Sequence, residues 1–145
     1  MILVICFSCS CTLFGGVSDE GSISVVVENA DGSYDIFEAD LGKVENKSEG
    51  VKGVLEYLSA ADDKLYVNMT DGGYGAYVSA IGNIAESPAD GAYVMIYTSF
   101  STDSYEGGPT VNYNGMTLYQ AGVGISGMSV ADGTVILFRR EVYEY

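Results

Sequence analysis

Hydrophobic and polar residues alternate in two segments near the start of the chain, on either side of an Asp31-Gly32 pair. One side of these segments carries four apolar residues: Ile23, Val25, Val27 and Ile36. An Asp-Gly pair between two alternating segments is a strong short-range signal for a β-hairpin. Residues 22–41 are therefore predicted to form two antiparallel strands.

The period of the pattern changes over residues 48–63. Four apolar residues recur there at the spacing of one helix face: Val51, Val54, Leu55 and Leu58. Ser48 is placed to cap the helix, and Glu49 would lie favourably in its first turn. Two glycines in this segment each weaken a helix by about 1 kcal/mol relative to alanine. The predicted helix therefore depends on packing against a sheet.

The rest of the pattern consists of strands and turns. Five more segments are predicted as strands, the fourth of them with an Asn-Gly pair inside it: 64–70, 76–82, 92–100, 110–120 and 134–145. A hairpin, one helix and several further strands make an α+β pattern. The predicted fold is a β-grasp-like mixed sheet with an N-terminal β-hairpin and one main helix packed on one face.

Glycines and an Asp132-Gly133 pair precede the last predicted strand. They include Gly122, Gly124 and Gly127, in the sequence AGVGISGMSVADGTVILF. Glycine permits backbone conformations that turns need, so the segment is interpreted as architecture that leads into a closing strand. The same glycines would also let a ligand approach the backbone.

The first seventeen residues resemble an export segment. They are apolar or small over most of their length and contain all 3 cysteines of the chain. Residues 1–17 are therefore predicted as a signal or lipoprotein-type segment, 18–21 as a short linker and 22–145 as the domain. Cys9 and Cys11 each follow a serine and are the candidates for lipid attachment. Simple secretion and a buried first strand at residues 2–7 are the alternatives.

Charge and residue inventory exclude several function classes. The 145-residue chain has 20 acidic and 6 basic residues and a net charge of −14, which would repel nucleic acid. It has no histidine, and its cysteines all lie in the export segment, so zinc sites and histidine-based nucleophilic catalysis lack their usual residues. We expect no enzymatic activity, no metal site and no cofactor. A membrane would be reached only through a lipid anchor.

Tyrosines are the remaining candidates for binding. A tyrosine ring offers rigid, amphipathic contact area to a ligand or a protein partner. The ligand-binding candidates lie on predicted strands and loops: Tyr74, Tyr93, Tyr97, Tyr105 and Tyr119. For each of them, a place in the core of the sheet is the alternative.

The order of these segments is similar to that of the transcobalamin-like C-terminal domain found in exported bacterial proteins. The similarity covers about residues 22–143 and depends on five stretches: SISVVVENADG, GVLEYL, GAYVSAIGNI, GAYVMIYTSF and GISGMSVADGTVILF. The family commonly has a Tyr-Trp pair on its central strand and an Asn-Gly turn after it. Here Val94 follows Tyr93, Thr98-Ser99 replaces the turn, and the chain has no tryptophan.

The resemblance implies a β-grasp module that is used for binding. In the cobalamin carriers for which the family is named, it implies that this domain closes over cobalamin together with a larger helical domain. The leading hypothesis is thus a non-catalytic, exported or lipid-anchored module at the cell surface or outside the cell. Its partner there would be a small molecule, with cobalamin as one option, or a protein. The alternative is a structural or adhesion domain without a small-molecule site.

Overall fold

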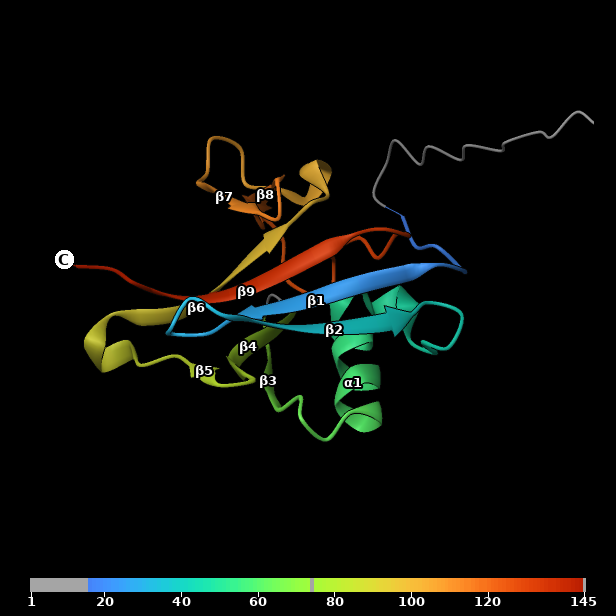
Figure 1. The fold of residues 1–145 in the computed structure, drawn as a ribbon, viewed down its shortest axis with the longest axis horizontal. Helices are drawn as coiled ribbons and strands as arrows, with labels where there is room; N and C mark the ends of the chain where they lie inside the picture. Colours follow the sequence, from blue (N-terminus) through green and yellow to red (C-terminus); the bar gives the residue numbers. More distant parts are fainter. Residues whose placement is uncertain (1–15, 74, 145) are drawn as a thin grey trace, which may run out of the picture.

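Two β-sheets and one α-helix make up the part of the chain that the computed structural model describes, residues 16–73 and 75–144 (Figure 1). Cys9, Cys11, Tyr74 and the alternative first strand at residues 2–7 lie outside the described residues. The elements follow in chain order: β1 Ser22–Glu28, β2 Tyr34–Asp40, η1 Lys47–Glu49, α1 Val51–Ala61, β3 Val67–Gly72, β4 Gly75–Ile81, β5 Ile84–Ala85, η2 Pro88–Asp90, β6 Ala92–Thr98, η3 Ser101–Asp103, β7 Thr110–Tyr113, β8 Met116–Gln120 and β9 Val135–Val142.

The larger sheet has six strands in the order β2-β1-β9-β6-β8-β7. β1 and β2 form the predicted antiparallel hairpin, with Val26 opposite Ile36. β1 and β9 run parallel, so the sheet is mixed and the α+β prediction is confirmed. Each of these two strands contains a continuous apolar run, residues 25–27 in β1 and 135–138 in β9, where both faces of the sheet are covered.

Side chains on the two faces of this sheet belong to separate apolar clusters. Below the sheet in Figure 1, α1 and the strands β3–β5 cover one face, and the cluster there includes Val25, Leu55 and Phe138. Above it, the β7–β8 hairpin folds over the other face, where Val26 and Leu118 belong to the smaller cluster. The alternation along each strand thus supplies both cores.

The smaller sheet was not predicted as a separate unit. β3, β4 and β5 pair only with one another in the order β3-β4-β5, and they share one face of the larger sheet with the helix. The sequence predicted these segments as strands of a single sheet. Periodicity identifies a strand but not its neighbours, so it could not separate the two sheets.

The helix carries its predicted apolar stripe but begins two residues later than expected. The buried residues of α1 include Val51, Val54, Leu55 and Leu58, which confirms the stripe. Ser48 is not the N-cap, because residues 47–49 form the 3₁₀ turn η1 and Gly50 occupies the cap position at φ 62°. No side chain caps the helix. Instead, the Lys52 amide donates to the Ile125 carbonyl at 3.3 Å.

Gly53 has a packing role that the sequence did not reveal. A Cβ atom at this position would overlap the backbone carbonyl of Asn46, so the loop before the helix lies directly against α1. Glycine lowers helix propensity, yet here the absence of a side chain is what allows the contact.

Hydrogen bonds join the residues at the start of β1 to the Asp132-Gly133 turn that precedes β9. The Ser22 amide donates to Asp132 Oδ1 at 2.9 Å, and the Asp132 amide donates to Ser18 Oγ at 3.0 Å. Residues 18–21, predicted as a linker, therefore have hydrogen bonds to the segment that precedes β9.

The burial of the helix stripe predicts its contribution to stability. Leu55 is fully buried, so Leu55→Ala should lower the free energy of unfolding by about 2–5 kcal/mol. Glu56→Ala is the matched control, because this neighbouring side chain is 39% exposed and its ion pair with Lys52 contributes about 0–1 kcal/mol. Urea unfolding of both variants measures the difference, and equal losses would contradict the facing of the helix.

The change in stability of Gly53→Ala distinguishes the packing role of Gly53 from its low helix propensity. Helix propensity alone predicts that Gly53→Ala stabilises the protein by about 1 kcal/mol. The overlap with Asn46 predicts instead a loss of roughly 1–3 kcal/mol. Gly73→Ala is the control, because a Cβ atom there would meet nothing within 4 Å. A more stable Gly53→Ala variant in urea unfolding would show that the loop does not hold this position.

Candidate functional site

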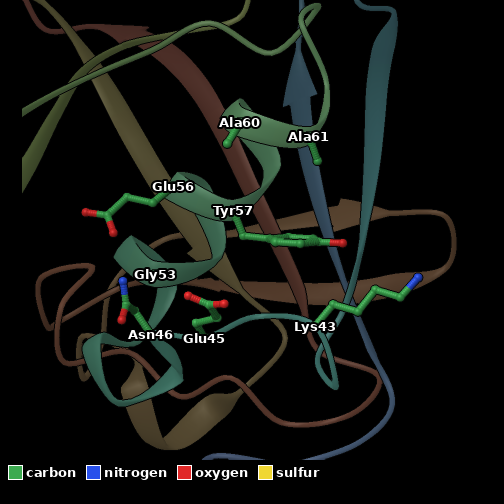
Figure 2. Close-up of a pocket in the computed structure, with 8 residues that line it drawn as sticks. All are labelled: Lys43, Glu45, Asn46, Gly53, Glu56, Tyr57, Ala60 and Ala61. Atoms are coloured by element: carbon green, nitrogen blue, oxygen red, sulfur yellow. The ribbon is translucent and has the colours of Figure 1, made fainter.

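An open hollow of about 440 Å³ lies between α1 and the loop that follows β2 (Figure 2). The loop and the helix contribute eight lining residues: Lys43, Glu45, Asn46, Gly53, Glu56, Tyr57, Ala60 and Ala61. A volume of this size is in the range of small-molecule sites. The hollow is therefore the candidate functional site.

The helix provides the floor and one wall of the hollow. Gly53, Tyr57 and Ala60 are spaced at i, i+4 and i+7, so they share a face of α1. This face lies beside the buried stripe. Its alanines leave space above the helix, whereas Gly53 is in contact with the loop. Figure 2 shows the Tyr57 ring extending from the helix toward Lys43. Tyr57 is half-buried and packs against the main apolar cluster, which restricts the motion of its ring.

The loop on the other side is held in place by several contacts. Val44 is buried in the main cluster. Lys47 Nζ donates to the Leu41 carbonyl at 2.9 Å, and the Glu49 amide donates to the Asn46 carbonyl at 3.0 Å. With the Gly53 contact described above, these interactions fix both walls. The hollow is thus formed before any ligand arrives.

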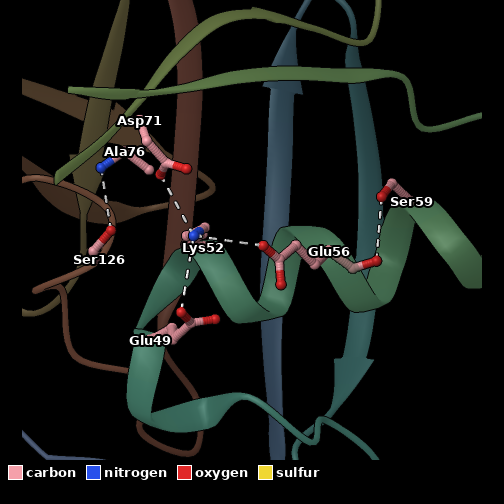
Figure 3. A network of polar contacts seen from close by, with 7 residues as sticks. All are labelled: Glu49, Lys52, Glu56, Ser59, Asp71, Ala76 and Ser126. Atoms are coloured by element: carbon pink, nitrogen blue, oxygen red, sulfur yellow. Dashed lines mark hydrogen bonds and ion pairs between the residues drawn. The ribbon is translucent and has the colours of Figure 1, made fainter.

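Charged groups surround the hollow unevenly. Figure 3 shows Lys52 between Glu49 and Glu56 of the helix segment and Asp71 of β3, at nitrogen–oxygen distances of 3.8, 3.8 and 3.5 Å. Asp71 above all, and then Glu49, raises the pKa of Lys52. Glu56 is thus ion-paired with Lys52. Lys43 at the opposite rim is mostly exposed, and its Nζ lies 3.9 Å from Asp40 Oδ2. The rim offers a cation, carboxylates and the Asn46 amide to a ligand.

Two of the tyrosines predicted for binding lie on β6, away from this hollow. Tyr97 is only 1% exposed and belongs to the smaller apolar cluster. Its hydroxyl donates to Glu141 Oε1 at 2.6 Å, and burial followed by this hydrogen bond raises the pKa of Tyr97. Tyr93 is half-buried, and its ring centre lies 6.4 Å from that of Tyr143.

Tyr105 and Tyr119 lie at the other end of β6. Tyr119 of β8 is opposite Thr98, and the Tyr105 amide donates to the Gln120 carbonyl at 2.8 Å. Thr98 follows Tyr93 by five residues, so these two tyrosines are about 17 Å along the strand from the Tyr93 ring. The structure therefore does not bring the predicted tyrosines together in one site. Tyr105 is 63% exposed, as a contact residue would be.

Sequence reasoning missed Tyr57 and the loop residues that face it. One signal was available, because a second helical stripe of small residues and one aromatic runs beside the apolar stripe of α1. The loop that closes the hollow left no comparable pattern in the sequence.

Within residues 16–73 and 75–144, no group of three His, Cys, Asp or Glu side chains is placed to hold a metal ion. In the same ranges, no helix is both long and apolar enough to cross a membrane.

Comparisons with known proteins identify related folds. No family model and no curated protein matches the sequence. A crystal structure of a candidate metal-binding protein from Ruminococcus gnavus is 15% identical, with a TM-score of 0.58, over 86% of this chain and 100% of that one. Haptocorrin in complex with Cbi is 13% identical with the same TM-score, over 86% of this chain and 25% of haptocorrin. At these identities the similarity shows a shared fold.

The buried Tyr97 hydroxyl predicts a loss of stability at alkaline pH. An unfolded tyrosine ionises with a pKa of about 10. The raised pKa of Tyr97 keeps this side chain protonated in the folded state, so the unfolded state gains stability as the pH rises above 10. The Tyr97→Phe variant should therefore lose less stability than the wild type as the pH rises above 10.

Urea unfolding from pH 7 to pH 11 measures this effect. At pH 7 the variant should be less stable by about 0.5–1.5 kcal/mol, because the bond to Glu141 is lost. That difference should shrink above pH 10. A constant difference across the whole range would mean that the Tyr97 hydroxyl ionises equally in both states.

Proposed function

We propose that the protein is a non-catalytic, exported binding module that holds a small ligand in the hollow beside α1. The observation that supports this function is the combination of a fixed loop wall, a small-residue floor and the Tyr57 ring in one hollow of about 440 Å³. A ring and a small floor suit a flat, partly apolar molecule, and polar groups at the rim would orient it.

The order of elements supports a β-grasp, transcobalamin-like assignment. A hairpin of β1 and β2 precedes the helix, and the last strand lies parallel to the first in the centre of the sheet. The fold shared with haptocorrin, which was crystallised with Cbi, makes Cbi and cobalamin the first ligands to test. The matched region covers 25% of the haptocorrin chain. We therefore expect this domain alone to contact only one edge of a bound corrinoid.

The sequence supports export and a location outside the cell as part of this proposal. The apolar residues 1–17 support a secreted or lipid-anchored protein at the cell surface, with Cys9 or Cys11 as the attachment point of a lipid. The acidic chain would then meet a small molecule or a protein partner outside the cell.

A structural role is the second candidate, and one observation favours it. β2 is an edge strand of the larger sheet, and among residues 16–73 and 75–144 no strand pairs with its outer side. It carries three acids, Asp35, Glu38 and Asp40. Charges on an edge strand oppose pairing between identical copies, so an adhesion partner would have to be a different, basic surface.

Filling the hollow tests the proposed function. Ala60→Met places a long side chain over the helix floor, and it should weaken ligand binding at least tenfold, the equivalent of about 1.4 kcal/mol. Ser59→Met introduces the same side chain at the next helix position, which does not line the hollow, and should leave affinity unchanged. Calorimetric titration of Cbi and cobalamin against the wild type and both variants measures the effect.

An NMR fragment screen tests the hollow without a named ligand. Fragments that bind there should shift the amide signals of Gly53, Ala60 and Ala61. Tyr105→Ala tests the exposed tyrosine loop as the alternative contact, and it should change neither stability nor affinity by much if the hollow holds the ligand. Absence of heat with both corrinoids, together with absence of any fragment at the hollow, would favour the structural role instead.

A further inference from the structure

Residues 107–131 form the longest stretch of the chain without a charged residue. The stretch includes β7, β8 and the loop that follows them, although the chain as a whole has a net charge of −14. Met116 and Val123 are among its exposed apolar side chains. Charged residues are depleted at the centres of protein–protein interfaces. Another protein can therefore cover this surface without burying an unpaired carboxylate.

The two edges of the larger sheet differ in charge. β2, at one end of the strand order, carries Asp35, Glu38 and Asp40, and like charges on an edge strand oppose pairing with an identical edge. β7, at the other end, has the uncharged sequence TVNY and pairs with β8 in a regular register. No strand within the described part of the chain pairs with its outer side. β7 thus lacks the charges that protect β2.

The backbone of β7 presents hydrogen-bonding groups to this free edge. The Gln120 amide of β8 donates to the Pro109 carbonyl at 3.2 Å, and bonded pairs alternate along two antiparallel strands. The amides and carbonyls of Thr110 and Asn112 therefore point away from β8. Both side chains are exposed as well. A second strand can thus reach this edge.

Contacts within the hairpin hold the edge in place. Asn114 and Gly115 form its two-residue turn, with φ angles of 50° and 77° that suit a tight hairpin. The Tyr113 ring packs edge-on against Tyr34, with ring centres 5.0 Å apart, and Leu118 is fully buried. Because β7 is already ordered, pairing would cost little conformational entropy.

An exposed tyrosine lies at the start of this edge. The Tyr105 amide donates to the Gln120 carbonyl at 2.8 Å, and a Cβ atom on Gly108 would meet Tyr105 Cδ1 at 2.8 Å. The ring therefore lies directly against the loop backbone, although most of its surface is open to solvent. A tyrosine held in this way offers rigid contact area to a protein.

We propose that β7 pairs antiparallel with β7 of a second copy of this chain, about a two-fold axis. With Val111 opposite Val111, Thr110 and Asn112 of the two copies would exchange about four backbone hydrogen bonds. Two acidic chains repel each other except where neither carries a carboxylate, and this edge meets that condition. The acids of β2 oppose pairing at the other edge, so the assembly closes as a dimer.

The expected dimer is weak and strengthened by salt. One four-residue strand buries less surface than a stable interface, so we expect a dissociation constant of roughly 10 µM to 1 mM. Screening shortens the range of the repulsion from about 10 Å at 0.1 M salt to about 3 Å at 1 M. Dimerisation should therefore increase with NaCl concentration, whereas a contact between opposite charges would weaken.

Sedimentation equilibrium at up to about 1 mM protein measures the dimer. Asn112→Asp places a carboxylate on each β7 edge and should weaken dimerisation at least tenfold. Asn68→Asp is the matched control, because it makes the same change at an exposed position of β3 and should dimerise like the wild type. Hydrogen exchange of the Thr110 and Asn112 amides should slow as the protein concentration rises.

A second variant covers the case in which Asn112→Asp disturbs the hairpin. Tyr105→Ala should weaken dimerisation at least threefold while urea unfolding stays that of the wild type. A wild type that is monomeric at about 1 mM protein and high salt would overturn the proposal, as would equal dimerisation of Asn112→Asp and Asn68→Asp. Ala60→Met should leave the dimer intact, so this edge and the hollow beside α1 can fail their tests separately.

Discussion

The parallel pairing of β1 with β9 is the constraint on which the rest of the structure depends. It joins the first and last strands at the centre of the larger sheet, and covering layers lie on both faces of this pair. The helix, the smaller sheet and the β7–β8 hairpin each bury apolar surface against this centre. The hollow beside α1 lies at its margin.

Local patterns in the sequence predicted the elements well. The hairpin of β1 and β2 and the stripe of α1 follow from periodicity and turn residues, which depend on near neighbours in the chain. The predicted helix start was wrong because a first-turn amide, that of Lys52, donates to the carbonyl of Ile125, more than seventy residues later. The second sheet was missed for a related reason, since strand partners are a long-range property.

The candidate sites were harder to predict than the fold. A tyrosine on a strand can face the core or the surface, and Tyr97 faces the core because alternation places it beside Leu137 on the covered side. Tyr57 lines a hollow only because the loop before the helix lies against Gly53. Such sites depend on how segments pack in three dimensions, which a single sequence does not show as a pattern.

The position of the last strand also has a consequence for the order in which the molecule can form. Ser22 and Asp132 are bonded although 110 residues separate them, and β9 follows Asp132 in the chain. A chain that emerges amino end first must therefore expose the apolar β1 until almost all of it has been made. Non-local topologies of this kind fold slowly. The six-stranded sheet can therefore be completed only after almost all of the chain has been made.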